Sequence, residues 1–424
     1  MALAQQTVAD VCLAARDASR VLAGLDTDTR DAALLAIADA LIAREGEILE
    51  ANAADLVAGR EAGLSDALLD RLALDPARIA AIADGTRAIA ALPDPVGEVV
   101  EGRRLPNGLD VRKVRVPFGV VAVVYEARPN VTIDAASLCL KSGNAVVLRG
   151  SSSATRSNAV LSSVAADAIA SVGIPAAAIG LVAGGGREEL RELATQDGVV
   201  DLIFPRGGEG LKNALKEVAT VPVIYAASGN CHVYVDATAD LDDAVRIIVN
   251  AKTQRPGVCN AAETLLVHAD AAPAFIPRAL RALHESGVEL RVDGRTRALA
   301  EPGLRGHLRD AIDSDWDEEF LALVLAVGIV DSATEAIEHV NRHGSGHSEA
   351  IVTRDTATAR AFERGVDAAC VYVNASTRFT DGGEFGMGAE IGNSTQKLHA
   401  RGPIGLRELC TFKYVVEGDG HIRP

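Results

Sequence analysis

The sequence has no closely spaced cysteines. Its six cysteines, at positions 12, 139, 231, 259, 370 and 410, are spread through 424 residues, so no pair forms a CxxC motif. This spacing excludes a short redox motif and a zinc knuckle. Scattered thiols without a disulfide framework are typical of a reducing compartment, and we predict a cytoplasmic protein.

Long apolar runs and a basic leader are also missing. The longest apolar run, residues 320–330, is much shorter than the roughly 20 residues that a membrane-spanning helix needs. The N-terminal segment contains Asp10 and Asp17 and has no basic region followed by an apolar one, so it does not resemble a secretory signal. We therefore expect no membrane association.

Basic residues are in deficit. The chain has 42 Lys and Arg against 58 Asp and Glu, a formal net charge of −16. This balance excludes a surface that binds nucleic acid nonspecifically, because such affinity comes from clustered basic residues. An anionic ligand must instead meet a few local groups. Hydrophobic residues make up 48% of the chain, which predicts a folded protein of roughly two or three domains.

The first part of the chain is helical in pattern. Residues 1–92 repeat apolar side chains at three- and four-residue spacing, which predicts amphipathic helices. Residues 98–116 then alternate apolar and polar side chains around Asn107-Gly108. This pattern predicts a β-hairpin whose two central residues both have positive φ.

Buried strands alternate with helices after Pro117. Val-rich runs such as 119–125 and 145–149 are separated by helical segments, as in a parallel sheet covered on both faces. We predict a doubly wound α/β domain that ends near residue 236 and includes a strand within 221–228.

A second α/β series follows, from residue 237 to about 400. Its first helix is predicted to begin after Asp240, in an acidic cluster that favours a helix N-terminus. Residues 408–418 are predicted to form a final strand.

Cys259 is the candidate nucleophile. It lies in a stretch broken by Pro256 and Gly257, just before the apolar strand predicted over 264–268. A thiol held rigidly on such a loop can be exposed and can receive backbone N–H donors, as a nucleophile requires. The alternative is that Cys259 is a small apolar side chain buried in the core, as most cysteines are. We assign this structural role to the other five cysteines.

Four long segments carry a family resemblance. They are residues 116–158, 228–261, 336–351 and 385–409. These segments closely resemble the gamma-glutamyl phosphate reductase family, also called glutamate-5-semialdehyde dehydrogenases, a divergent branch of the aldehyde dehydrogenase superfamily. The resemblance extends over nearly the whole chain.

The resemblance implies an α/β fold of the aldehyde dehydrogenase type. A Rossmann-type cofactor domain is expected over 1–97 and 117–236, an α/β catalytic domain over 237–402, and a small β oligomerisation flap over 98–116 and 403–424. Strands that leave the body to pair with a partner protect open sheet edges. We therefore expect a homodimer or a dimer-based oligomer.

The resemblance also assigns catalytic residues. Cys259 is expected to attack the substrate, and its backbone N–H and the Asn130 amide are expected to hold the oxyanion. Hydrolysing relatives carry a water-activating glutamate where this chain has Ala226. Its absence suits an enzyme that must keep water off its thioester. The alternative is that the alignment of this chain with those relatives is shifted by a few residues, so that Ala226 is not the equivalent position.

NADPH is the expected cofactor. Arg149, Ser151 and Ser152 follow a strand where relatives carry Lys and Glu, and an acidic residue there would repel a 2′-phosphate. The alternative for Arg149 is a solvated strand end. Gly207 and Gly208 open a helix whose N–H groups favour a phosphate.

Four further residues are candidates for ligand contacts. Glu319 matches the acidic residue that holds the nicotinamide ribose in relatives, and a solvated acidic cluster is the alternative. Arg255, Arg378 and Arg401 are candidates for the substrate's phosphate or carboxylate, because guanidinium binds either one bidentately. Ordinary surface ion pairs are the alternative for these arginines.

No metal site is expected. His339, His343 and His347 are spaced four apart, which on an unbroken helix would place them on one face. Gly344 and Gly346 break that helix.

The function implied by the resemblance is reduction of L-glutamyl 5-phosphate to L-glutamate 5-semialdehyde with NADPH, releasing phosphate, in proline biosynthesis. Two rivals stay open: an aldehyde dehydrogenase that acylates coenzyme A, and a catalytically silent scaffold of the same fold. The expected partners are the small-molecule substrate, phosphate, a second copy of the chain and glutamate 5-kinase, with no nucleic acid and no membrane.

Overall fold

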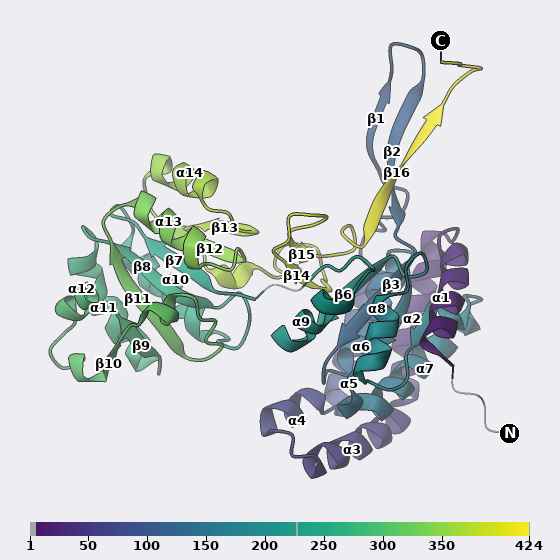
Figure 1. Cartoon of the computed structure of the whole chain (residues 1–424), viewed down its shortest axis with the longest axis horizontal. Helices are drawn as coiled ribbons and strands as arrows, with labels where there is room; N and C mark the ends of the chain where they lie inside the picture. Colours follow the sequence, from purple (N-terminus) through teal and green to yellow (C-terminus); the bar gives the residue numbers. More distant parts are fainter. Residues whose placement is uncertain (1–5, 226–227, 424) are drawn as a thin grey trace. The chain divides into compact units, whose positions relative to one another are not determined.

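The computed structural model describes residues 6–225 and 228–423, and the chain forms two compact units (Figure 1). Unit 1 comprises Met1–Ala226, Met387–Gly392 and Ile404–Pro424, and unit 2 comprises Ala227–Gly386 and Asn393–Pro403. The boundary that we predicted after residue 236 differs from this division. The reason is that strand β7 (Cys231–Val235) pairs with strands of unit 2.

Unit 1 contains a parallel sheet with the strand order β5-β4-β3-β6. The strands are β3 (Val120–Tyr125), β4 (Ala145–Arg149), β5 (Ile179–Leu181) and β6 (Leu202–Arg206). Strands β3 and β4 are buried along their whole length, as in a sheet covered on both faces. The predicted strand within 221–228 includes positions 226 and 227, which lie outside the described residues; over 221–225 it is reduced to one bridge, Ile203 to Val223, and Pro222 has no N–H to extend the pairing.

Helices surround this sheet and account for the predicted helical opening. The helices of unit 1 are α1 (Val8–Leu22), α2 (Thr27–Ala43), α3 (Glu45–Glu61), α4 (Asp66–Leu72), α5 (Pro76–Ala90), α6 (Asn130–Lys141), α7 (Thr155–Ser171), α8 (Arg187–Ala194) and α9 (Glu209–Val218). Helix α2 packs against α5, α6 and α7, whereas α1 packs against α8 and three strands of the sheet. Asp26 and Asp75 begin α2 and α5 by accepting backbone N–H groups of the first turn.

A three-stranded antiparallel sheet runs away from the α/β part of the same unit (Figure 1). Its strands, in the order β1-β2-β16, are β1 (Val99–Arg104), β2 (Asp110–Pro117) and β16 (Cys410–Glu417). The predicted hairpin and final strand are confirmed, but the predicted turn is wrong. Gly108 alone has positive φ, 92°, while Asn107 does not. Pro106 sets a tight turn ahead of Asn107, and a single left-handed glycine then closes it.

Unit 2 is built on a seven-stranded parallel sheet with the order β10-β9-β11-β8-β7-β12-β13. The remaining strands are β8 (Ala262–His268), β9 (Glu289–Val292), β10 (Leu308–Asp310), β11 (Val324–Val330), β12 (Ser348–Val352) and β13 (Cys370–Val373). The helices are α10 (Leu241–Thr253), α11 (Ala272–Glu285), α12 (Gly294–Leu299), α13 (Ala333–His343) and α14 (Thr356–Gly365). Asp240 caps α10 as predicted, accepting the N–H groups of Asp242 and Asp243.

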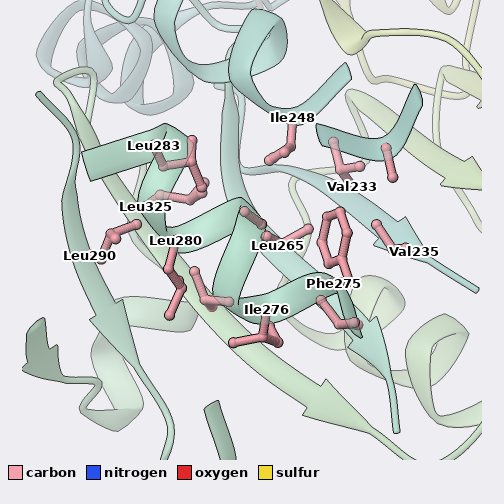
Figure 2. Close-up of a cluster of buried hydrophobic side chains, with 14 of the residues drawn as sticks. Val233, Val235, Ile248, Leu265, Phe275, Ile276, Leu280, Leu283, Leu290 and Leu325 are labelled. Carbon is pink, nitrogen blue, oxygen red and sulfur yellow. The ribbon is translucent and has the colours of Figure 1, made fainter. Parts of the chain in front are cut away.

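The larger of two hydrophobic clusters in unit 2 lies between this sheet and helices α10 and α11, and the smaller one includes residues of α13 and α14. Figure 2 shows Phe275 and Leu280 of α11 beside Leu265 of β8 and Val233 of β7, all of them buried. Burial of each such side chain contributes about 1.5–3 kcal/mol, which makes the sheet a rigid platform for the loops at its edges.

A two-stranded sheet forms where the chain passes between the two units. It pairs β14 (Gly392–Ser394) with β15 (Gly402–Ile404). Within the described residues, none of the helices has both the length and the apolar character needed to cross a bilayer.

Candidate active site

Cys259 lies at the N-terminal edge of the sheet of unit 2, in the loop between α10 and β8. Because all seven strands are parallel, their first residues meet at this edge. Cys259 is half-buried, whereas the other five cysteines are buried. Burial raises the pKa of the neighbouring Cys231 thiol well above its usual range, so Cys231 keeps its proton. Cys259 is thus the cysteine best placed to meet a substrate.

Two arginines flank the Cys259 loop. The Arg378 Nε donates to Gln254 Oε1 at 2.8 Å, and its Nη1 bonds Asn260 Oδ1. Burial lowers the pKa of Arg378, and the positive charge of exposed Arg255 lowers it further. An anion bound near these two positive charges would relieve their repulsion.

Arg401 lies elsewhere in unit 2. Its Nη1 donates to Asp367 Oδ1 at 2.8 Å, and its Nη2 donates to the Asp367 carbonyl at 3.0 Å. Arg401, Asp367, Ser345 and Glu349 line a pocket of about 440 Å³. Arg378 thus binds residues of the Cys259 loop, whereas Arg401 binds Asp367 and lines this pocket.

Glu319 is half-buried and faces the segment that precedes β7. Its Oε1 accepts the N–H of Gly229 at 2.7 Å. The Gly229 backbone in turn lies against the backbone of Cys259. Glu319 is therefore not simply part of a solvated acidic cluster, and one carboxylate oxygen links it to the Cys259 region.

Apart from Glu319, which lies in unit 2, the cofactor residues proposed from the sequence lie in unit 1. Arg149 ends β4, is 7% exposed, and donates through Nη2 to the carbonyls of Gly185 at 2.5 Å and Gly186 at 2.6 Å. Burial lowers its pKa, and the charge of Glu189 opposes that shift. The Arg149 Nε is buried without a hydrogen-bond partner, so part of its donor capacity is unused.

Two serines follow Arg149. The Ser151 and Ser152 pair precedes α7, and the Ser151 hydroxyl bonds that of Ser153 at 2.7 Å. A Cβ on Gly185 would come within 2.7 Å of the Ser152 N. The chain from Gly184 to Gly186 thus packs on the serine turn and joins Arg149 to it.

The turn at Gly207 and Gly208 opens α9, as predicted. The Gly208 N–H donates to the Glu126 carboxylate at 3.1 Å, and a Cβ on Gly207 would come within 2.8 Å of that carboxyl group. A negatively charged oxygen therefore already accepts from this helix N-terminus. The turn fits a phosphate oxygen in the same role, provided that the exposed Glu126 side chain moves aside.

Asn130 begins α6, also in unit 1. Its Nδ2 donates to Asp134 Oδ2 at 2.9 Å. Burial raises the pKa of Asp134 to about 6, and the Asn130 hydrogen bond opposes that shift. The Asn130 amide is therefore held by its own helix.

A buried ion pair was not predicted from the sequence. Lys252, at the end of α10, pairs with Glu263 of β8, and both side chains are fully buried. The Glu263 Oε1 also accepts the N–H of Leu321 at 3.3 Å. These residues bracket Cys259 in the sequence, and a Lys and a Glu inside an apolar helix and strand were the signal that could have revealed them.

The three histidines do not form a metal centre. Burial and neighbouring positive charge lower the pKa of His339 to about 3, so its ring stays neutral. No group of three or more His, Cys, Asp and Glu suited to holding a metal ion occurs within 6–225 and 228–423.

The model of the aldehyde dehydrogenase family matches residues 1–300 and 309–415. The chain belongs to the aldehyde dehydrogenase family. Members of this family are oxidoreductases that use nicotinamide cofactors.

Within the family, the chain is similar to gamma-glutamyl phosphate reductases. It is 55% identical to the enzyme of Thermobifida fusca, with 99% of both chains covered, and 57% identical to that of Heliobacterium modesticaldum, with 96% of this chain and 97% of the relative covered. The crystal structure of the Thermotoga maritima enzyme superposes with a TM-score of 0.96 at 44% identity, covering 99% of this chain and 100% of that one. The recognition from the four sequence segments is confirmed.

A more distant aldehyde dehydrogenase shares the fold. An acetylating aldehyde dehydrogenase of Geobacillus thermoglucosidasius is 18% identical, covers 98% of this chain and has a TM-score of 0.68. The position assigned to the missing water-activating carboxylate, Ala226, lies outside the described residues.

Proposed function

We propose that this chain reduces L-glutamyl 5-phosphate to L-glutamate 5-semialdehyde with NADPH and releases phosphate. The observation that carries the proposal is the setting of Cys259, a half-buried thiol at a sheet edge, on a loop that also carries Arg255 and that Arg378 binds through Gln254 and Asn260. A thiolate there can attack an acyl carbon while the arginines stabilise the departing phosphate. The relatives named gamma-glutamyl phosphate reductase supply the identity of the acyl group.

The first step forms a thioester. The Cys259 thiolate bonds to the acyl carbon, the carbonyl oxygen becomes an oxyanion, and the bond from carbon to the phosphate oxygen then breaks. The Cys259 backbone N–H is a donor for the oxyanion. Phosphate leaves with the electron pair of the broken bond, and Arg255 and Arg378 stabilise its negative charge. Asn130 is proposed as the second oxyanion donor on the family resemblance alone.

NADPH supplies the hydride that reduces the thioester carbonyl. The resulting thiohemiacetal then releases the aldehyde and returns Cys259 as a thiolate. Arg149, Ser151 and Ser152 are proposed to receive the 2′-phosphate, the Gly207 and Gly208 turn a phosphate of the dinucleotide, and Glu319 the nicotinamide ribose. The packing of Arg149 and the 184–186 stretch on the serine turn, and the anion already held by Gly208, support this assignment.

The sequence also favours reduction over hydrolysis. Position 226 holds alanine, which cannot activate water. A thioester on Cys259 therefore persists until the hydride arrives. This supports an enzyme whose product is a free aldehyde.

The reverse reaction tests the proposal. Purified protein is given L-glutamate 5-semialdehyde, NADP⁺ and phosphate, and formation of NADPH is followed by absorbance. Activity that requires phosphate or arsenate and disappears in Cys259→Ala supports the proposal. Activity that requires coenzyme A instead would support the acylating alternative, and no turnover with any acceptor would support the silent scaffold.

We further propose that the β1-β2-β16 sheet joins copies of the chain. Tyr414 and Val416 of β16 are 64% and 53% exposed, and Val99 of β1 is 51% exposed. Apolar side chains on open edge strands favour pairing with another chain. This surface supports a homodimer or a dimer-based oligomer.

A further inference from the structure

The backbone of Cys259 rests on the segment from Gly229 to His232, which leads into β7. A Cβ on Gly229 would overlap the carbonyl group and Cα of Cys259. The Cys231 thiol, which keeps its proton, donates to the Cys259 carbonyl oxygen at 3.2 Å. The position of the nucleophile therefore depends on the position of this segment, called the 229–232 segment below.

Side chains from other parts of unit 2 hold the 229–232 segment. The Asn230 N–H donates to Ser345 Oγ at 3.0 Å, and the His232 N–H donates to Glu349 Oε2 at 2.7 Å. Glu319 accepts the Gly229 N–H on the other side. Three backbone donors of a four-residue segment thus bind side chains, two of them from the stretch 345–349 and one from Glu319.

Glu349 is buried in unit 2 and has a second contact to the same segment. Its Oε2 lies 3.0 Å from the Nδ1 of His232, and both side chains are almost fully buried. Burying a carboxylate is costly unless hydrogen bonds offset the loss of water. None of the chemical steps proposed above uses Glu349. Its hydrogen bonds to His232 are therefore the interactions that offset the free-energy cost of burying its carboxylate.

Ser345 belongs to a loop that is joined closely to Asn230. The Ser345 N–H donates to the Asn230 carbonyl at 3.4 Å, and the Asn230 side chain donates to the carbonyls of His343 at 2.8 Å and Trp316 at 2.6 Å. Glycine at 344 suits this tight packing, because a Cβ there would lie 2.5 Å from the Val340 carbonyl oxygen and 3.0 Å from Glu349 Oε1. The glycine-broken histidine stretch therefore supports the 229–232 segment.

We propose that Ser345 and Glu349 are positioning residues, which fix the Cys259 nucleophile by holding the 229–232 segment. The proposal rests on the proposed function only in treating Cys259 as the nucleophile. A displacement of about 1 Å at a reacting atom can cost on the order of 100-fold in rate. Loss of either side chain should therefore lower kcat and change the reactivity of Cys259, and leave NADPH affinity unchanged.

The test uses two pairs of variants of the full-length protein. Glu349→Ala and Ser345→Ala remove the acceptors, while Glu349→Gln and Ser345→Thr each keep an oxygen that can accept the same N–H. Glu338→Ala and Ser286→Ala, both exposed, serve as matched controls. For each variant, kcat, NADPH affinity by fluorescence, and iodoacetamide labelling of Cys259 by peptide mass spectrometry are measured, with the five buried cysteines as internal references.

The expected result is a fall in kcat of about 10- to 100-fold in both alanine variants, with an altered rate of Cys259 labelling. The Gln and Thr variants should recover to within about fivefold of wild type, and NADPH affinity should not move. If Glu349→Ala fails to fold, the Ser345 pair decides the outcome by the same criteria.

Two results would overturn the proposal. One is wild-type kcat and wild-type Cys259 labelling in folded alanine variants. The other is a lower kcat with unchanged Cys259 labelling. Labelling needs no substrate, so it separates this proposal from the proposed function: altered labelling in variants of a protein that never turns over the semialdehyde would support positioning and contradict the function.

Discussion

Gly229 and Cys259 touch through their backbones. A Cβ on Gly229 would occupy the space of the Cys259 carbonyl group, so glycine is required by close approach and not by an unusual φ. The candidate nucleophile is therefore supported directly by a residue far from it in the sequence.

Gly229→Ala should displace the Cys259 loop. We expect a loss of stability of about 1–3 kcal/mol from overpacking and a loss of activity of at least about 100-fold. Urea unfolding and the NADP⁺ reduction assay measure the two effects. Gly303→Ala is the control, because a Cβ there meets nothing within 4 Å. Equal activity in the two variants would contradict the contact.

Breaking the Lys252 and Glu263 pair should be strongly destabilising. Glu263→Gln leaves a buried ammonium without its counter-charge, and we expect a loss of about 3–5 kcal/mol in urea unfolding. The exposed pair between Arg281 and Glu301 provides the control, since Glu301→Gln should cost about 1 kcal/mol or less. Similar losses in both variants would mean that the buried pair has no special role.

Arg149→Ala should weaken NADPH binding selectively. A charge-assisted hydrogen bond contributes about 1.5–3 kcal/mol, so the KM for NADPH should rise about 10- to 100-fold while the KM for NADH changes little. Initial rates with the two cofactors measure the ratio. Arg191→Ala, at an exposed site on α8, should leave the ratio unchanged. An equal rise for both cofactors would remove Arg149 from 2′-phosphate recognition.

Asp134 should make stability depend on pH. Its pKa is about 6 in the folded protein against an ordinary 3.8, so between these values the unfolded chain releases a proton that the folded protein keeps. Stability therefore falls as pH rises through this window and stays lower above it. Asp134→Asn should gain about 1–3 kcal/mol relative to wild type between pH 4 and pH 7, measured by urea unfolding at each pH. A constant difference across this range would contradict the raised pKa.

Charges on β16 should break the proposed assembly. Tyr414→Asp combined with Val416→Asp should convert the oligomer to monomer in light scattering coupled to gel filtration, because two carboxylates would be buried without partners. Ile312→Asp, at another exposed apolar site, should leave the mass unchanged. A monomeric wild-type protein would contradict the proposal at once.

Much of the fold follows from local patterns. Apolar spacing of three and four residues predicted helices before residue 92, and Val-rich runs predicted strands β3 and β4. Both predictions are confirmed, because each pattern depends only on residues a few positions apart. Position 236 shows the limit of this approach. The sequence places β7 at the end of the first series, whereas its pairing with β8 and β12 assigns it to unit 2.

The sequence by itself determined the family and the α/β class, because long ordered motifs are local features of the chain. It also predicted Cys259 as the nucleophile, from a Pro/Gly-broken loop before a strand and from the family resemblance. Tertiary structure alone decided what surrounds that thiol. Strand β7 lies between β8 and β12, and this order brings Gly229 against Cys259 and places Glu349 on the His232 backbone. The order of strands in a sheet depends on the packing of the whole unit, so no local pattern specifies it.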